Sequence, residues 1–188
     1  MVGLGNPGDR YDHTRHNVGA EAAVIFAQSS GNPLRLEKRL KARVSEFSLD
    51  GRRIVVAVPT TFMNESGQCV SALVRRYEIE DWSSLVILHD ELDLQAARIK
   101  LKQGGGLAGH NGLRSITSYL HTQDYARVRI GVGKPPGGPE QGADWVLSKV
   151  PKAEREQLDM ACAHAAQAVA MIFEQGIDAA MQQMNAGN

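Results

Sequence analysis

Short apolar segments alternate with amphipathic ones along the whole chain, and this order constrains the fold more than any other feature. Strands are expected where β-branched content or period-two alternation is bounded by turn residues, at Val2–Leu4, Ala42–Leu49, Arg53–Val58, Leu85–Leu88, Arg98–Leu101 and Arg127–Val132. Helices are expected at Gly19–Ala27, Ser66–Tyr77, Asn111–Leu120 and Ala153–Glu174. Such alternation predicts an α/β three-layer sandwich, with a twisted mixed central sheet and helices on both faces.

The length of 188 residues suits a single domain, residues 1–188. No apolar run approaches the roughly 18 residues that cross a bilayer, and the N-terminus lacks a signal-peptide pattern. Cys69 and Cys162 have no metal-binding or disulfide spacing. We therefore expect a soluble, cytoplasmic protein. The expected oligomeric state is a monomer.

Proline and glycine divide the C-terminal third. The segment Lys134–Gly142 is rich in both, which predicts an irregular loop that is either a mobile lid or a plain connector. Pro151 is expected to open the long C-terminal helix, and Gly176 to cap its end.

Charge is balanced overall, with 21 basic and 21 acidic residues, which argues against a large sequence-independent grip on duplex nucleic acid. The basic residues nevertheless gather in two sets. The first comprises Arg35, Lys38, Arg39, Lys41 and Arg43, and the second Arg98, Lys100, Lys102, Arg127, Arg129 and Lys134. Each set is either a solvated face or a local phosphate-binding patch.

His16 lies between Arg15 and Asn17, outside any apolar stripe. A neutral imidazole can take a proton from water if another group fixes its tautomer. Asp90 is the candidate for that group, because it follows the apolar strand expected at Leu85–Leu88 and should project at the carboxyl end of that strand. The alternative for Asp90 is a carboxylate that caps a helix or turn.

Asn6, Asn64 and Asn111 fall at the ends of expected loops. Their amides both donate and accept hydrogen bonds, which suits an ester carbonyl, a ribose hydroxyl and a water molecule. Each is alternatively an ordinary turn or cap residue. At Asn111, which opens a helix, the backbone amides can face an anion, or Asn111 can be a simple N-cap.

Other catalytic patterns fit poorly. The glycines of Gly3–Gly8 formally match a dinucleotide fingerprint, but Pro7 interrupts it and only two residues precede it. His13, His16, His89, Asp90 and His110 offer potential metal ligands, yet HExxH spacing and Cys–His clusters are absent. GxSxG is absent as well. Neither a metal nor another cofactor is expected.

Four ordered motifs resemble the bacterial-type peptidyl-tRNA hydrolase family, from residue 2 to the C-terminal helices. They are Asn6-Pro7-Gly8 with Tyr11 and Thr14–Asn17, then Pro59–Asn64 with Ser66-Gly67, His89–Asp93, and Gly104–Gly112. The resemblance implies hydrolysis of the ester between a peptide and the 3′-terminal ribose of tRNA, which recycles tRNA after abortive translation. Peptidyl-tRNA is then the expected partner, without a membrane.

The resemblance also implies roles for individual residues. His16 would be the general base and Asp90 its orienting partner. The implied substrate-binding residues are Asn6, Tyr11, Met63, Asn64, His110, Asn111 and Gly112, and Lys102 and Arg129 match positions that bind tRNA phosphates. A metal-dependent small-molecule hydrolase and a noncatalytic tRNA-binding or ribosome-binding protein remain as alternatives.

Overall fold

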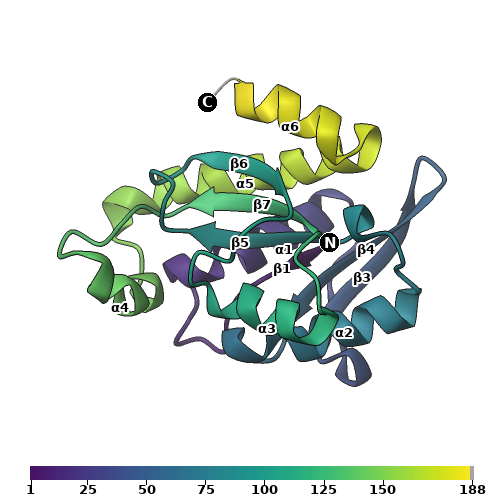
Figure 1. Cartoon of the computed structure of the whole chain (residues 1–188), viewed down its shortest axis with the longest axis horizontal. Helices are drawn as coiled ribbons and strands as arrows, with labels where there is room; N and C mark the ends of the chain where they lie inside the picture. Colours follow the sequence, from purple (N-terminus) through teal and green to yellow (C-terminus); the bar gives the residue numbers. More distant parts are fainter. Residues whose placement is uncertain (187–188) are drawn as a thin grey trace.

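A seven-stranded mixed sheet forms the middle layer in a computed structural model, which describes residues 1–186 (Figure 1). Its strands are β1 (Val2–Gly3), β2 (Arg35–Glu37), β3 (Ala42–Leu49), β4 (Arg52–Pro59), β5 (Val86–Glu91), β6 (Ile99–Gln103) and β7 (Ala126–Gly131). Their order is β2-β3-β4-β1-β5-β7-β6. The central pairs β4–β1, β1–β5 and β5–β7 are parallel, and the remaining pairs are antiparallel.

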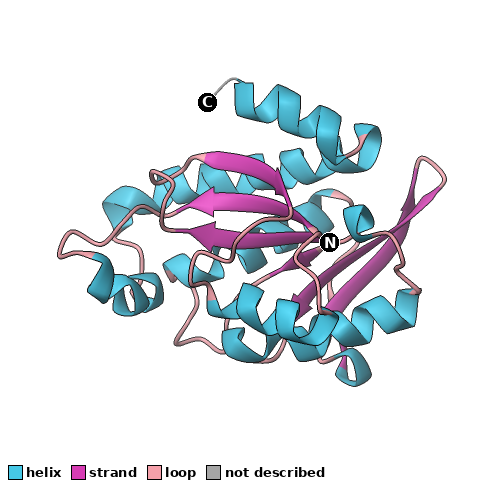
Figure 2. Cartoon of the chain, viewed as in Figure 1, coloured by secondary structure: helices cyan, strands magenta, loops and turns pink. Residues whose placement is uncertain are grey.

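Helices cover both faces of this sheet (Figure 2). They are α1 (Val18–Ser29), α2 (Ser66–Tyr77), α3 (Asn111–Leu120), α4 (Gly142–Leu147), α5 (Lys152–Gln175) and α6 (Ile177–Ala186). One core cluster joins α1, α5 and α6 to the sheet, and the other joins α2 and α3. The predicted three-layer sandwich is confirmed. No helix within residues 1–186 is long and apolar enough to cross a membrane.

Several elements differ from the expectations. Strand β2 was not predicted, because its exposed residues Arg35-Leu36-Glu37 lack an apolar pattern and its pairing comes from β3. Helices α4 and α6 were also not predicted. Strand β5 runs through Glu91, so Asp90 lies within the strand instead of after it, paired with Ile130 of β7. A polar strand end is stabilised by backbone pairing, which side-chain patterns do not report.

The predicted ends of the long helix are confirmed. Helix α5 has Pro151 as its N-cap and ends at Gly176, whose φ of +84° suits glycine and whose N–H donates to the carbonyl of Ile172. The segment Lys134–Gly142 is irregular apart from a 3-10 turn at Pro139–Gln141 and its last residue, Gly142, which begins α4.

Two glycines bring α1 directly onto the sheet. A Cβ at Gly3 of β1 would overlap the backbone of Gly19, and a Cβ at Gly19 would overlap the carbonyl of Leu88 in β5. This close approach places the 3-10 turn η1 (Arg15–Asn17), which precedes α1, at the carboxyl end of β5. Ligands of open α/β sheets commonly bind at this edge.

Candidate active site

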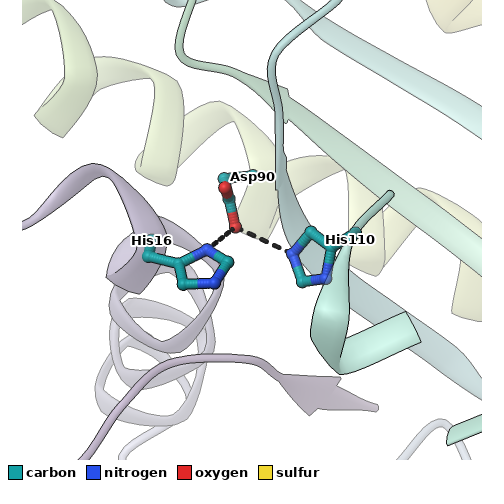
Figure 3. A group of neighbouring side chains, drawn as sticks. All are labelled: His16, Asp90 and His110. Atoms are coloured by element: carbon teal, nitrogen blue, oxygen red, sulfur yellow. Dashed lines mark hydrogen bonds and ion pairs between the residues drawn. The ribbon is translucent and has the colours of Figure 1, made fainter. Parts of the chain in front are cut away.

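His16 and Asp90 form a buried pair at the carboxyl edge of the sheet (Figure 3). His16 comes from turn η1 and Asp90 from β5, and Nδ1 of the histidine lies 2.7 Å from Oδ1 of the carboxylate. Since a carboxylate accepts, the proton of a neutral His16 ring is on Nδ1, and Nε2 keeps its lone pair. The two residues that were expected near one edge of the sheet are thus in direct contact, and Nε2 of His16 is left without a proton.

His110 also bonds to Asp90, which the sequence did not indicate. Its Nε2 lies 2.9 Å from the same Oδ1 atom (Figure 3). Its Nδ1 accepts from the backbone amides of Gly112 at 3.1 Å and Leu113 at 3.3 Å, so His110 is the N-cap of α3. The expectations that Asn111 caps this helix, or that these two amides face an anion, are wrong, because the imidazole occupies them.

This capping fixes the tautomer of His110. With Nδ1 accepting two N–H groups, the ring proton is on Nε2 and points at Asp90. His16, Asp90 and His110 offer ligand atoms within 4.8 Å of one another, the spacing of a possible metal site. In the hydrogen-bonded arrangement, however, neither nitrogen of His110 has a free lone pair. A metal ion here would have to break the cap of α3.

The contact with Asp90 also changes the proton affinity of His16. Burial lowers the pKa of His16, but the charge and hydrogen bond of Asp90 together outweigh it and raise that pKa above 6.5. Burial alone would raise the pKa of Asp90, whereas the two histidines hold it well below its usual range. Asp90 is therefore ionised and stabilises a proton gained by His16.

The pKa of the neighbouring His89 is shifted in the opposite direction. Burial, and next the proximity of His110, lower the pKa of His89 to about 3. Its Nδ1 lies 2.7 Å from the backbone carbonyl of Asp90, and its Nε2 has no hydrogen-bond partner within residues 1–186. His89 thus stays neutral beneath the site and helps to hold the backbone of Asp90.

Asn6 is held by Asn17, a residue whose role sequence reasoning missed. The Asn17 side chain accepts from the Asn6 N–H at 2.8 Å and donates to the Asn6 carbonyl at 2.9 Å. The Oδ1 atom of Asn6 accepts from the Met63 amide at 2.7 Å. Within residues 1–186 the Nδ2 donors of Asn6 have no partner, so they are free for a ligand. The position of Asn17 next to His16 is the sequence feature that could have pointed to this role.

Two connected cavities meet at His16. One, of about 420 Å³, is lined by Asn6, Tyr11, His16, Phe62, Met63, Asn64, Asn111, Ala143, Val146 and Leu147. The other, of about 270 Å³, is lined by His16, Asp90, Glu91, Leu92, Ala108, Gly109, His110, Asn111, Gly142, Ala143 and Val146. We call their union the reactive groove. Phe62 and Leu147, exposed by 50% and 43%, form apolar rims that sequence reasoning missed.

Gly112 does not line either cavity. It is buried, and a Cβ at this position would lie 2.6 Å from Sδ of Met63 and 3.0 Å from Cε1 of His110. Its absence of a side chain lets α3 approach η3 (Met63–Glu65) and the imidazole closely. Gly112 therefore shapes the groove by packing, which differs from the expected lining role.

Arg15 connects the His16 turn to α4, another feature that sequence reasoning missed. Its buried guanidinium stacks on Trp145, 3.5 Å from the ring centroid. Nη1 donates to Ser148 at 2.8 Å, and Nη2 pairs with Glu154 at 2.7 Å. Helix α4 also lines the reactive groove, through Ala143 and Val146. Arg15 thus anchors one wall of the groove beside His16.

The residues of the second basic set differ in their accessibility in the folded protein. Lys102 lies opposite Arg127, and Lys100 opposite Arg129, so all four belong to one face of the β6–β7 pair. Arg127 is buried and donates to the carbonyls of the glycine-rich loop and of Gln123, so it supports that loop and is not available to phosphate. Arg129 pairs with Glu91 at 3.0 Å, and both Arg129 and Lys102 are partly accessible.

Known peptidyl-tRNA hydrolases are similar to this chain over nearly its whole length. The sequence profile of the peptidyl-tRNA hydrolase family matches residues 1–188. A peptidyl-tRNA hydrolase of Rhodococcus erythropolis is 44% identical over 185 residues, which is 98% of this chain and 96% of that protein. One from Mycolicibacterium gilvum is 45% identical over 186 residues, 99% of this chain and 96% of that protein.

A solved structure matches over nearly the same length. The crystal structure of peptidyl-tRNA hydrolase from Acinetobacter baumannii superimposes with a TM-score of 0.91 at 37% identity, covering 98% of this chain and 93% of that chain. Both sequence and fold therefore match over nearly the full length, and the chain belongs to the peptidyl-tRNA hydrolase family.

Proposed function

We propose that this protein hydrolyses the ester bond between a peptide and the 3′-terminal ribose of peptidyl-tRNA, with His16 as the general base. The observation that carries the proposal is the 2.7 Å contact between His16 Nδ1 and Asp90 Oδ1, which leaves Nε2 unprotonated on the wall of an amide-lined groove. Family membership supplies the substrate class.

The reaction follows from the free lone pair of His16. Nε2 removes a proton from water while the water oxygen attacks the ester carbonyl, whose electron pair moves onto the carbonyl oxygen. Asp90 stabilises the imidazolium that forms. The oxyanion then re-forms the carbonyl, the bond to the ribose oxygen breaks, and His16 returns its proton to that oxygen. The products are a peptide carboxyl group and a tRNA with a free 3′-terminal hydroxyl.

The asparagines supply polar contacts around this centre. The free Nδ2 donors of Asn6 suit the developing oxyanion, because a preorganised donor is most effective where charge appears. Asn64 and Asn111 are exposed in the same groove and offer both donors and acceptors to the ribose, the peptide main chain and the attacking water. Met63 and Tyr11 provide apolar surface for the substrate.

Metal independence is part of the proposal. It is supported by the tautomer of His110, which directs a proton at Asp90 where a metal would need a lone pair. Lys102 and Arg129 are proposed to bind phosphates of the acceptor stem. We further propose that the protein acts as a monomer in the cytoplasm and recycles tRNA after abortive translation.

The test is cleavage of an N-acylated aminoacyl-tRNA by the purified protein, with and without a chelator. We expect cleavage that is insensitive to chelation, and a loss of roughly 10²- to 10⁴-fold in kcat for His16→Ala with tRNA affinity retained. Abolition by the chelator would favour a metal-dependent hydrolase. Binding of tRNA without any cleavage would favour a noncatalytic binding protein.

A further inference from the structure

The first basic set forms an exposed surface that the reaction described above does not use. Its residues lie on β2, on the 3-10 turn η2 (Lys38–Leu40) and at the start of β3. We define the edge patch as the exposed cations Arg35, Lys38, Arg39 and Arg43. Glu37 is the one carboxylate between residues 35 and 43. The patch is therefore strongly positive in a chain whose formal net charge is zero.

The cations of the edge patch are not engaged by the protein. Within residues 1–186, none of the four makes an ion pair or a side-chain hydrogen bond, whereas the adjacent Lys41 donates to Gln68. In the second basic set, by contrast, Arg129 pairs with Glu91 and Lys134 pairs with Asp93. Four neighbouring cations without protein partners are available to an external polyanion.

The sheet pairing places this patch at the reactive edge. Ala42 pairs with Pro59 at the end of β4 and with Glu37 at the end of β2, so turn η2 lies where β4 terminates. Because β1, β4 and β5 are parallel, this is also the edge that carries Asn6 and Asp90.

The patch is also close to the groove, on a different side from Lys102 and Arg129. Arg43 lines a cavity of about 640 Å³ together with Asn6. Strands β2 and β6 are at opposite ends of the strand order, so the edge patch and the Lys102–Arg129 pair lie on opposite sides of β1 and β5, the strands that lead to Asn6 and carry Asp90.

We propose that the edge patch is a second phosphate-binding surface for the RNA part of the substrate, an inference that rests on the proposed function. An ester held in the reactive groove tethers the RNA, so nearby phosphates meet the patch at high effective concentration. Asp9 and Asp12 also line the cavity that Arg43 borders, and their charges repel phosphate. The RNA backbone therefore passes over turn η2 instead of entering that cavity.

The decisive variant is Lys38→Ala/Arg39→Ala, which alters two exposed side chains of a surface turn. Its matched control is Arg75→Ala/Arg76→Ala, which removes the same charge from the exposed last turn of α2. Helix α2 begins at the reactive edge and returns the chain to the start of β5, so its last turn lies at the other edge of the sheet.

Kinetics are measured on full-length N-acetylaminoacyl-tRNA and on N-acetylaminoacyl-adenosine. For Lys38→Ala/Arg39→Ala at low salt, we expect KM for the tRNA substrate to rise roughly three- to tenfold with kcat unchanged, as for the loss of two surface charge contacts. The plot of log(kcat/KM) against the logarithm of the salt concentration has a negative slope, and its magnitude should decrease by about 1 to 2 in the variant. The adenosine substrate and the control variant should behave like the wild type.

If Lys38→Ala/Arg39→Ala has the same kinetics and salt slope as the wild type on the tRNA substrate, the inference is wrong. It is also wrong if the variant loses the same activity on both substrates. Binding of deacylated tRNA is measured in parallel by fluorescence anisotropy. If the wild-type protein cleaves neither substrate, the proposed function fails. The anisotropy result then still decides whether Lys38 and Arg39 bind RNA.

Discussion

The anchor between Arg15 and α4 makes a prediction that links stability to catalysis. Arg15→Met keeps most of the apolar stem and removes only the guanidinium. The variant loses a desolvated stack on Trp145, of about 1 to 2 kcal/mol, and a hydrogen bond to Ser148 of about 1 kcal/mol. The ion pair with Glu154 adds little, because that carboxylate is half exposed and water replaces its partner.

Part of this loss is offset, because Met does not carry a buried charge and because Arg15 Nε has no hydrogen-bond partner within residues 1–186. The net expectation is a fall of about 2 kcal/mol in the free energy of unfolding. The wall formed by Ala143 and Val146 then loses its attachment beside His16. We expect kcat/KM to fall about tenfold through misplacement of the groove wall.

Urea denaturation and steady-state hydrolysis measure the two effects on the same preparation. Arg155→Met is the matched control, since Arg155 pairs with Glu21 and Asp159 and lines neither of the two cavities that form the reactive groove. The control should lose stability with normal kcat/KM. Unchanged stability of Arg15→Met would refute the energetic reasoning, and lowered stability with normal kcat/KM would show that the anchor does not shape the groove.

Three further predictions concern charge and pH. Asp90→Asn should lower kcat and move the acidic limb of the pH profile of kcat/KM to lower pH, because Asp90 raises the pKa of His16; an unmoved limb would exclude this coupling. Neutral folded His89, with a pKa of about 3, contributes stability above pH 6.5 that is lost as the pH falls toward 3. The free energy of unfolding, measured by urea denaturation, should therefore fall less steeply below pH 6.5 in His89→Leu than in the wild type, by up to about 1.4 kcal/mol per pH unit. The same pH dependence in both proteins would contradict this. Lys102→Ala/Arg129→Ala should raise KM for tRNA and spare N-acetylaminoacyl-adenosine; equal losses on both would place these residues in the reaction centre or the fold.

The amino-acid sequence alone was sufficient to predict the layered α/β architecture and the kinds of side chain at the candidate site. Period-two and helical patterns are local, so the α/β sandwich and the strand before Asp90 could be recognised without knowing any partner. His16 could be proposed as a site residue from its position outside an apolar stripe, together with the four motifs. Strand β2 and the polar end of β5 escaped because their stability comes from pairing with neighbouring strands.

Tertiary structure decided which side chains act together. Arg15 meets Trp145 and His110 meets Asp90 across long separations in sequence, and one-dimensional spacing does not encode such contacts. Arg127 illustrates the same limit, since its charge suggested phosphate binding while the folded loop directs it to backbone carbonyls. The protonation of each imidazole depends on which groups surround it, so the unprotonated Nε2 of His16 is determined only when α1 and β5 pack together.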